Sequence, residues 1–285
     1  MEQRTVHSTN DVTLTVHDFG GDGPDVLFAH ATGFHGLVWE PVIRRLPQFR
    51  CLSIDFRAHG DSSAPRNRPL EWEGFADDVL AVCDDFNLTS PMAVGHSKGG
   101  ASVLLAEIAR PGTFKMMYLY EPVVMPPQMA IGYQSDNPLS NGARKRRSSF
   151  PSKQDAMENY AAKPPFSVLD PDALAAYVDH GFVELDAPDE NGNAVTLKCR
   201  PENEAEVYAH GSAHQAFLAL GNVQCPVTIA IGNETYGPAA FGPGLVEALP
   251  HGFLRTYPDL AHFGPLENPE KIAAEISDAF VVMSA

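Results

Sequence analysis

The sequence has few cysteines, few basic residues and no long apolar run, and each shortage excludes a class of protein. The four cysteines are scattered and form no C-x-x-C pair, which argues against a structural zinc site and favours free thiols. Lysine and arginine number 20 against 36 acidic residues, a formal net charge of −16. This balance argues against nucleic acids and anionic membranes as partners. No stretch approaches the roughly 20 apolar residues of a membrane span.

The N-terminal residues are polar and lack the apolar core of a secretion signal, so we expect a cytoplasmic protein. At 285 residues, with 44% hydrophobic and 20% charged side chains, the chain suits one large α/β domain with or without an insertion. No internal repeat and no cluster of metal-ligand residues is visible, and we expect no metal or other cofactor. The sequence leaves a monomer and a homodimer equally open.

Short apolar runs alternate along the chain with segments of helical periodicity. Strands are expected around the polar turn at residues 10–11 and then at residues 26–29, 51–54, 92–94, 116–120, 227–231 and 253–257. Helices are expected at residues 39–46, 71–86, 98–110 and 245–249 and along the C-terminal segment. Because the strands are almost wholly apolar, they predict a parallel sheet with helices on both faces.

Residues 123–215 break this alternation. They open with several prolines and contain helix-like pieces, one of them starting at Ser152 with Asp155 three residues on. We interpret this segment as a mostly helical insertion between two parts of one core, residues 1–122 and 216–285. The basic run Arg144–Arg147 inside it is expected on a solvated helix face, with a contact to an anionic substrate as the alternative.

The stretch Gly95-His96-Ser97-Lys98-Gly99 lies between a predicted strand and an apolar helix. This arrangement is typical of the G-x-S-x-G nucleophile elbow, in which a serine occupies a sharp strand-to-helix turn. The glycines make room for that turn, and the N–H groups at the start of the helix face a developing oxyanion. The alternative is a serine that only caps a helix.

Other polar residues follow the remaining strand ends. They are His30-Ala31-Thr32, the run from Asp55 to Ser62, Glu121, Gly232-Asn233-Glu234 and His262. Since ligands of open parallel sheets bind at the carboxyl ends of the strands, these residues are candidates for one site.

In combination, these segments resemble the α/β-hydrolase superfamily, in its cap-bearing branch of epoxide-hydrolase-like and esterase-like members. Residues 58–62, Ala-His-Gly-Asp-Ser, resemble the family loop R-G-H-G-x-S, and residues 262–270 resemble the C-terminal G-H-F-x-x-x-E-x-P-E segment. The resemblance covers nearly the whole chain except the insertion, which occupies the usual position of the cap. It implies a mostly parallel sheet of the eight-stranded type with helices on both faces and a helical cap at residues 123–215.

The resemblance also implies roles for individual residues. Ser97 is the expected nucleophile, which excludes the aspartyl-ester mechanism of related epoxide hydrolases and haloalkane dehalogenases. His262 is the expected general base. The backbone N–H groups of Thr32 and Lys98 are expected to form the oxyanion hole. We expect the Lys98 side chain to be solvated, and His30, His59 and His96 to be structural.

The acid of the triad departs from the usual pattern. Family members most often carry an Asp in a G-x-x-D segment after the penultimate strand, where this chain has Thr235. Glu234 lies one residue earlier, and Glu121 ends the strand that follows the elbow helix. Some relatives keep their acid at that strand end. We therefore prefer Glu121 as the acid, with Glu234 as the alternative.

The predicted function is hydrolysis of a small, apolar ester or lactone through an acyl-enzyme. The same triad also suits a C–C bond hydrolase, a perhydrolase or a lyase, and a ligand-binding member of the fold without catalysis is a further alternative. Phe34, His35 and Trp39 are candidates for lining the pocket, although core packing is an equal alternative for Trp39. Cap residues Met125, Met129, Tyr133, Phe166 and Phe182 are candidates for an apolar lid, with core packing as the alternative for each of them.

Overall fold

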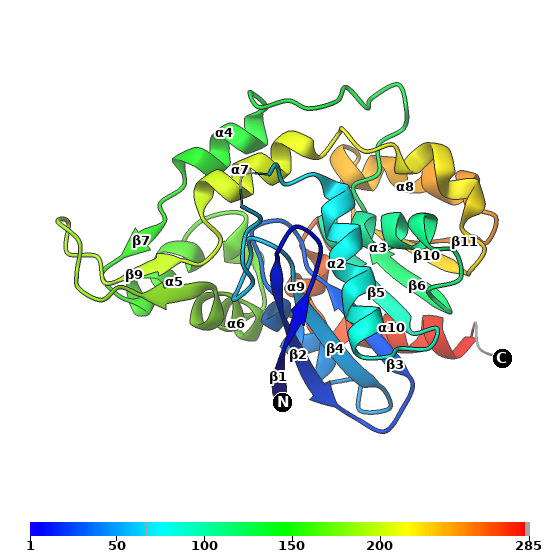
Figure 1. Ribbon diagram of the computed structural model, residues 1–285, viewed down its shortest axis with the longest axis horizontal. Helices are drawn as coiled ribbons and strands as arrows, with labels where there is room; N and C mark the ends of the chain where they lie inside the picture. Colours follow the sequence, from blue (N-terminus) through cyan, green and yellow to red (C-terminus); the bar gives the residue numbers. More distant parts are fainter. Residues whose placement is uncertain (67, 283–285) are drawn as a thin grey trace.

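A computed structural model describes residues 1–66 and 68–282 and has an eight-stranded sheet at its centre (Figure 1). The strands lie in the order β1-β2-β4-β3-β5-β6-β10-β11. The pairs β1–β2 and β2–β4 are antiparallel, and the other neighbours are parallel. The predicted mostly parallel α/β sheet is confirmed. The strands are β1 (Glu2–His7), β2 (Thr13–Gly20), β3 (Asp25–Ala29), β4 (Arg50–Asp55), β5 (Met92–His96), β6 (Met116–Tyr120), β10 (Val227–Ile231) and β11 (Gly252–Thr256).

The central strands β3, β5, β6 and β10 are buried on both faces, which explains why they are continuous apolar runs, whereas the outer strands β1 and β11 are largely exposed. In β3, Leu27 and Ala29 join one hydrophobic cluster, whereas Val26 and Phe28 point to the opposite face and join another. The first cluster contains helices α2 (Trp72–Asp85), α3 (Lys98–Ala109) and α8 (Gly237–Ala248). The second contains the 3₁₀ helix η1 (Gly36–Trp39), α1 (Glu40–Ile43) and α10 (Pro269–Val282).

The segment between β6 and β10 forms a lobe beside the sheet, drawn from green to yellow in Figure 1. Its helices are α4 (Pro138–Lys145), α5 (Lys153–Ala161), η2 (Phe166–Val168), α6 (Pro171–Gly181) and α7 (Pro201–His210). The 3₁₀ helix η3 (Ala216–Asn222), which also precedes β10, packs instead on α3 and α8 beside the sheet. As expected, Ser152 caps α5, because its hydroxyl accepts a hydrogen bond from Asp155 N–H at 3.1 Å. The lobe also holds an antiparallel sheet that the sequence did not predict, made of β7 (Ser149–Phe150), β9 (Val195–Leu197) and β8 (Phe182–Glu184).

The apolar residues expected to form a lid have different surroundings. Phe182 is buried in the core of the lobe, and Met125 and Phe166 are half-buried. Met129 and Tyr133 are about half exposed, at 53% and 49%. These five side chains therefore do not form one continuous apolar lining.

Within residues 1–66 and 68–282, no helix combines the length and the apolar character needed to cross a membrane.

Candidate active site

Ser97 lies in a strained turn between β5 and α3. Its backbone has φ 55° and ψ −117°, a region that residues other than glycine rarely occupy. The turn is held by hydrogen bonds, since Ser97 N–H donates to the Tyr120 carbonyl at 2.9 Å and the Ser97 carbonyl accepts from Val123 N–H at 3.2 Å. A strained serine fixed in this way is the backbone arrangement of a nucleophile elbow.

The glycines around Ser97 allow close approaches of the backbone. A Cβ on Gly95 would lie 2.6 Å from Gly100 Cα, and one on Gly99 would lie 2.1 Å from the Ala29 carbonyl oxygen. Either side chain would force the start of α3 away from the end of the sheet. The tight turn therefore requires glycine at both positions.

His262 lies on the loop before α9 (Gly264–Glu267), and several hydrogen bonds hold that loop. The Glu267 carboxylate accepts hydrogen bonds from the N–H groups of Ala261 and Phe263, at 2.9 and 3.1 Å, on either side of the histidine. The Tyr120 hydroxyl donates to the Ala261 carbonyl at 2.7 Å. The sequence assigned no role to either side chain, although Glu267 belongs to the motif that singled out His262.

His96 connects the two candidate catalytic segments. Its Nε2 donates to the His262 carbonyl at 2.7 Å, and the two rings lie 5.1 Å apart. Because His96 directly precedes Ser97 in the chain, this bond holds the loop of His262 against the end of β5. Burial lowers the pKa of His96 well below its usual range, so this ring is neutral near pH 7.

Glu121 is completely buried and contacts the His262 ring. Its Oε2 lies 2.6 Å from His262 Nδ1, and its Oε1 accepts a hydrogen bond of 2.8 Å from Gly232 N–H. Its own N–H donates to the Ala230 carbonyl at 2.8 Å. A carboxylate that accepts the Nδ1 proton leaves Nε2 unprotonated and able to take a proton from another group.

Glu234 has different partners. It is half-buried and accepts a hydrogen bond of 2.8 Å from the hydroxyl of Tyr236, which is itself exposed. In the part of the chain that the structure describes, no hydrogen bond or ion pair joins Glu234 to His262. Of the two candidate acids, the structure brings only Glu121 into contact with this histidine.

The two backbone N–H groups expected to bind an oxyanion are those of Thr32 and Lys98. Thr32 is buried in the turn after β3, which the Phe34 N–H to Ala31 carbonyl bond closes at 3.3 Å. Lys98 is the first residue of α3. Among the described residues, neither N–H has a hydrogen-bond acceptor, so both are available to a bound oxygen atom.

The expectation of a solvated Lys98 side chain is wrong. The residue is completely buried, and its Nζ lies 4.0 Å from the centroid of the Phe56 ring and 4.2 Å from that of Phe75. Nζ has no hydrogen-bond partner among the described residues. The side chain extends from the first turn of α3 toward α2, so it is covered by packing that a local pattern does not reveal. Desolvation holds the pKa of Lys98 well below its usual range.

Of the three residues proposed to line a pocket, Phe34 lies in an aromatic cluster next to His262, whereas His35 and Trp39 have other partners. Phe34 is part of an aromatic cluster with Phe263, at 5.6 Å between centroids, and Phe263 is in turn 5.3 Å from the His262 ring. His35 is buried and donates from Nε2 to the Tyr177 carbonyl at 3.2 Å. Trp39 packs on Phe28 at 5.3 Å, inside the core, which agrees with the packing alternative for this residue.

Two further histidines lie deep behind the turn of Thr32. His30 Nδ1 donates to the Ala31 carbonyl at 2.7 Å and its Nε2 accepts from Phe56 N–H at 3.1 Å, whereas His59 donates from Nδ1 to the Arg57 carbonyl at 2.8 Å. These contacts agree with the structural role expected for both.

The described residues contain no group of three or more histidine, cysteine, aspartate or glutamate side chains placed to hold a metal ion.

Comparisons with known proteins agree with this architecture. A model of the "Alpha/beta hydrolase family" matches residues 26–275. An epoxide hydrolase of Caballeronia sordidicola is 30% identical over 117 residues, which cover 39% of this chain and 34% of that protein. Peroxisomal membrane protein LPX1 of Saccharomyces cerevisiae is 26% identical over 288 residues, covering 89% of this chain and 74% of that protein. The crystal structure of E-2-(acetamidomethylene)succinate hydrolase superposes with a TM-score of 0.79 at 21% identity, over 97% of this chain and 98% of that one, and at this identity it shows the fold alone.

Proposed function

The chain belongs to the alpha/beta hydrolase family, and on that premise we propose that it is a serine hydrolase that cleaves a small-molecule carboxylic ester or lactone. The observation that carries the proposal is the 2.6 Å contact between His262 Nδ1 and the buried Glu121 carboxylate, beside the strained turn of Ser97. We further propose that residues 123–215 act as a cap that covers the substrate.

In the proposed acylation step, His262 Nε2 takes the proton of the Ser97 hydroxyl as Oγ attacks the substrate carbonyl carbon. The carbonyl oxygen becomes an oxyanion and accepts hydrogen bonds from Thr32 N–H and Lys98 N–H. The negative charge of Glu121 stabilises the imidazolium that forms. The carbon–oxygen bond of the ester then breaks, and His262 gives its proton to the departing alkoxide.

In the proposed deacylation step, a water molecule takes the place of the alcohol. His262 removes a proton from this water, whose oxygen attacks the acyl carbon, and the same two N–H groups bind the second oxyanion. The bond between the acyl carbon and Ser97 Oγ breaks, and the protonated His262 restores the serine hydroxyl. The product is a carboxylic acid, and no group besides these residues and water takes part.

A serine as nucleophile distinguishes this proposal from epoxide opening through an aspartyl ester. That mechanism needs a carboxylate at the elbow, where this chain has the hydroxyl of Ser97. This chain is therefore not expected to open epoxides through an aspartyl ester, although one of its relatives is an epoxide hydrolase.

The proposed location of the protein is the cytoplasm, and fractionation of the host cell tests this proposal.

The test combines active-site labelling with turnover. A fluorophosphonate probe is expected to label the wild type and to label neither Ser97→Ala nor His262→Ala, and p-nitrophenyl esters of several acyl lengths are expected to be hydrolysed by the wild type only. Labelling without cleavage of any ester or lactone would overturn the proposed substrate class and point to C–C hydrolase, perhydrolase or lyase chemistry. Absence of labelling in folded protein would point to a ligand-binding role instead.

A further inference from the structure

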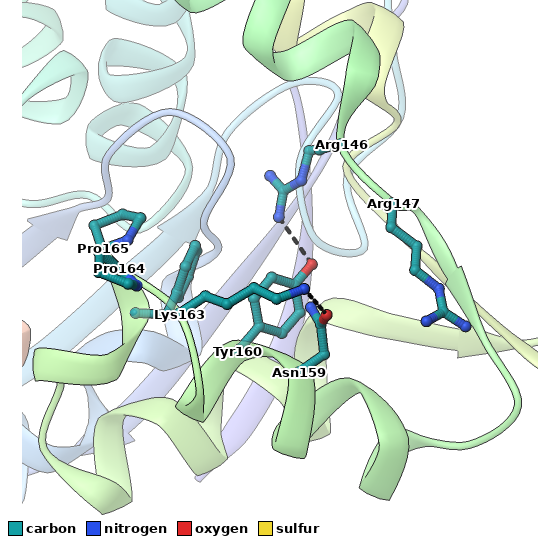
Figure 2. A pocket seen from close by; sticks show the side chains of 8 residues that line it. Arg146, Arg147, Asn159, Tyr160, Lys163, Pro164 and Pro165 are labelled. Atoms are coloured by element: carbon teal, nitrogen blue, oxygen red, sulfur yellow. Dashed lines mark hydrogen bonds between the residues drawn. The ribbon is translucent and has the colours of Figure 1, made fainter.

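A cavity of about 340 Å³ lies in the lobe, between the loop after α4 and the end of α5 (Figure 2). The residues that line it include three cations and no carboxylate. Its floor and sides are formed by Arg146, Arg147, Asn159, Tyr160, Lys163 and Phe166. In a chain with a formal net charge of −16, three cations around one cavity are a local reversal of the overall charge.

Two of these cations have no acidic partner. Lys163 Nζ donates to the Asn159 side-chain oxygen at 2.7 Å, as Figure 2 shows, and Arg147 Nε donates to the Ser149 carbonyl at 2.9 Å. Within the described ranges, neither side chain forms an ion pair with an aspartate or glutamate. The Arg147 guanidinium also lies 4.2 Å over the Phe150 ring and donates to the Asn193 side-chain oxygen at 3.5 Å. Because no carboxylate neutralises either side chain, both charges attract an anion that enters the cavity.

Arg146 is held rigidly at the inner end of the same cavity. Its Nη1 lies 2.5 Å from Glu204 Oε2, and its Nη2 donates to the hydroxyl of Tyr177 at 2.6 Å and to that of Tyr160 at 3.1 Å. Burial disfavours the charge on Arg146, but its interactions with Tyr177, Glu204 and Tyr160 outweigh this effect and raise its pKa. Three bonds fix the guanidinium plane and leave its Nε and one Nη1 hydrogen for a further acceptor.

The ion pair of Arg146 and Glu204, at the edge of the cavity, also lies against a turn of the candidate active site. A Cβ placed on Gly33, the residue after Thr32, would lie 2.6 Å from Glu204 Oε1 and 3.5 Å from Arg146 Nη1. The ion pair that borders the cavity therefore also lies against the turn that carries one of the proposed oxyanion donors.

An aromatic wall makes a second connection. Phe166 lines the cavity, and its ring lies 5.8 Å from Phe34 and 6.3 Å from Phe263. The Phe263 ring is in turn 5.3 Å from that of His262. These ring contacts form a continuous aromatic path from the cavity at Phe166 to the candidate catalytic histidine.

We propose that this cavity binds a carboxylate at the far end of the substrate's acyl group, so that the preferred substrates are esters or lactones whose acyl chain ends in a carboxylate. This inference rests on the proposed ester hydrolysis and adds the class of its substrate. The aromatic side chains contact the chain of the acyl group, and Arg147 and Lys163, with Arg146 behind them, bind its anionic end.

The test compares two esters with acyl chains of equal length. These are p-nitrophenyl pentanoate and the mono-p-nitrophenyl ester of glutarate, which differ by a terminal carboxylate. Since each charge-assisted hydrogen bond contributes about 1.5–3 kcal/mol, the wild type is expected to favour the glutarate ester by about 10- to 100-fold in kcat/KM, mainly through KM. The double variant Arg147→Gln/Lys163→Gln is expected to lose most of this preference, and the ratio of the two kcat/KM values within each protein is the readout.

The matched control is Lys145→Gln, which removes an exposed cation of the same basic run that does not line the cavity. It is expected to keep the preference, and a loss equal to that of the double variant would overturn the inference in favour of a diffuse charge effect. Equal kcat/KM values for the two esters in the wild type would also overturn it, while the proposed ester hydrolysis would stand.

Calorimetry with free glutarate tests the cavity without turnover. Binding in roughly the millimolar range to the wild type, weakened at least 10-fold in the double variant, is expected. Absence of binding to the wild type would refute the inference, whether or not any ester is hydrolysed. Failure of both esters and of fluorophosphonate labelling, with glutarate binding intact, would refute the proposed hydrolysis and the substrate class that rests on it, while the cavity would stand as a carboxylate-binding site.

Discussion

Replacing Glu121 by glutamine changes one oxygen atom to an NH₂ group at the centre of the candidate active site. In the wild type, Oε1 accepts a hydrogen bond from Gly232 N–H, and Oε2 faces His262 Nδ1 at 2.6 Å. The glutamine has only one oxygen. Because the buried Gly232 N–H must keep an acceptor, the amide oxygen is expected to stay there and the NH₂ group to face the histidine.

This orientation has a direct consequence for the protonation of His262. An NH₂ group that donates toward Nδ1 needs an unprotonated Nδ1, so the single proton of the neutral ring moves to Nε2. A protonated Nε2 cannot accept the proton of the Ser97 hydroxyl. The imidazolium that would form in the transition state also loses its negative partner.

The expected loss follows from both effects. A wrong tautomer together with a missing counter-charge lowers kcat by about 10³- to 10⁴-fold, equivalent to about 4–5.5 kcal/mol of transition-state stabilisation. KM for p-nitrophenyl pentanoate is expected to change by less than about threefold, because Glu121 is buried behind the histidine and does not contact the acyl chain.

Glu234→Gln is the matched control, because it makes the same chemical change in the alternative acid. Its expected kcat is within about twofold of the wild type, since the Glu234 carboxylate contacts the Tyr236 hydroxyl and not His262. Thermal unfolding of both variants shows whether a loss of activity is a loss of fold. If folded Glu121→Gln kept more than a tenth of the wild-type kcat while Glu234→Gln lost it, the assignment of the acid would be refuted.

Three further predictions concern buried groups. Lys98→Met removes a buried amine that has no hydrogen-bond partner among the described residues, so the free energy of unfolding measured in urea is expected to rise by about 1–4 kcal/mol. Because burial depresses the folded-state pKa of Lys98, the cost of keeping this group in the folded protein is largest at low pH, and the gain from the variant should shrink as pH rises toward 10.5. Burial lowers the pKa of His35 to about 4, so on acidification His35 of the unfolded chain is protonated before His35 of the folded protein. The free energy of unfolding is therefore expected to fall by about 3 kcal/mol between pH 6.5 and 4, and the fall should be smaller in His35→Gln. Gly33→Ala places a side chain at φ +80° and 2.6 Å from Glu204 Oε1, and it should lower both the melting temperature and, by at least about tenfold, kcat; an unchanged kcat would contradict the placement of the oxyanion turn.

The parts of the fold that the sequence predicted are those with a strong local signal. The central strands are buried on both faces and are therefore continuous apolar runs, and the strand ends follow directly from where those runs stop. The turn of Ser97 is also local, because the glycines on either side of it fix its geometry. By contrast, β7 and β8 contain two and three residues, too few for any periodicity to appear.

The helix predicted at residues 245–249 is longer in the structure than the sequence indicated. The structure has α8 begin at Gly237, with Pro243 inside the helix. Glycine and proline normally mark a break, so the sequence pattern argued for a shorter element. Packing of this helix against β10 and β11 overrides the local preference, as tertiary contacts often do.

The basic run at residues 144–147 shows why single side chains escape prediction within a correctly described segment. Arg144, Lys145 and Arg147 are exposed, as expected for a solvated face, but Arg146 is largely buried. What draws it inward is Glu204 on α7, 58 residues further along the chain. No pattern within the run distinguishes Arg146 from its neighbours, because its partner comes from the fold of the lobe.

The position of Glu121 explains how a carboxylate from β6 can stand where the resembled family usually has an aspartate after β10. Strand β6 lies between β5 and β10, so its end is adjacent both to the turn of Ser97 and to the segment that lacks the aspartate. The Glu121 N–H bonds to the Ala230 carbonyl in β10, and its side chain reaches Gly232 N–H just beyond that strand. The carboxylate thus lies over the end of β10 although its backbone belongs to the neighbouring strand. The positive φ of Glu121, 44°, turns the chain at this point, and such strain in a residue other than glycine persists only where the surrounding contacts hold it. The bonds to Ala230, Gly232 and His262 are those contacts, so removing the carboxylate should disturb this turn as well as the histidine.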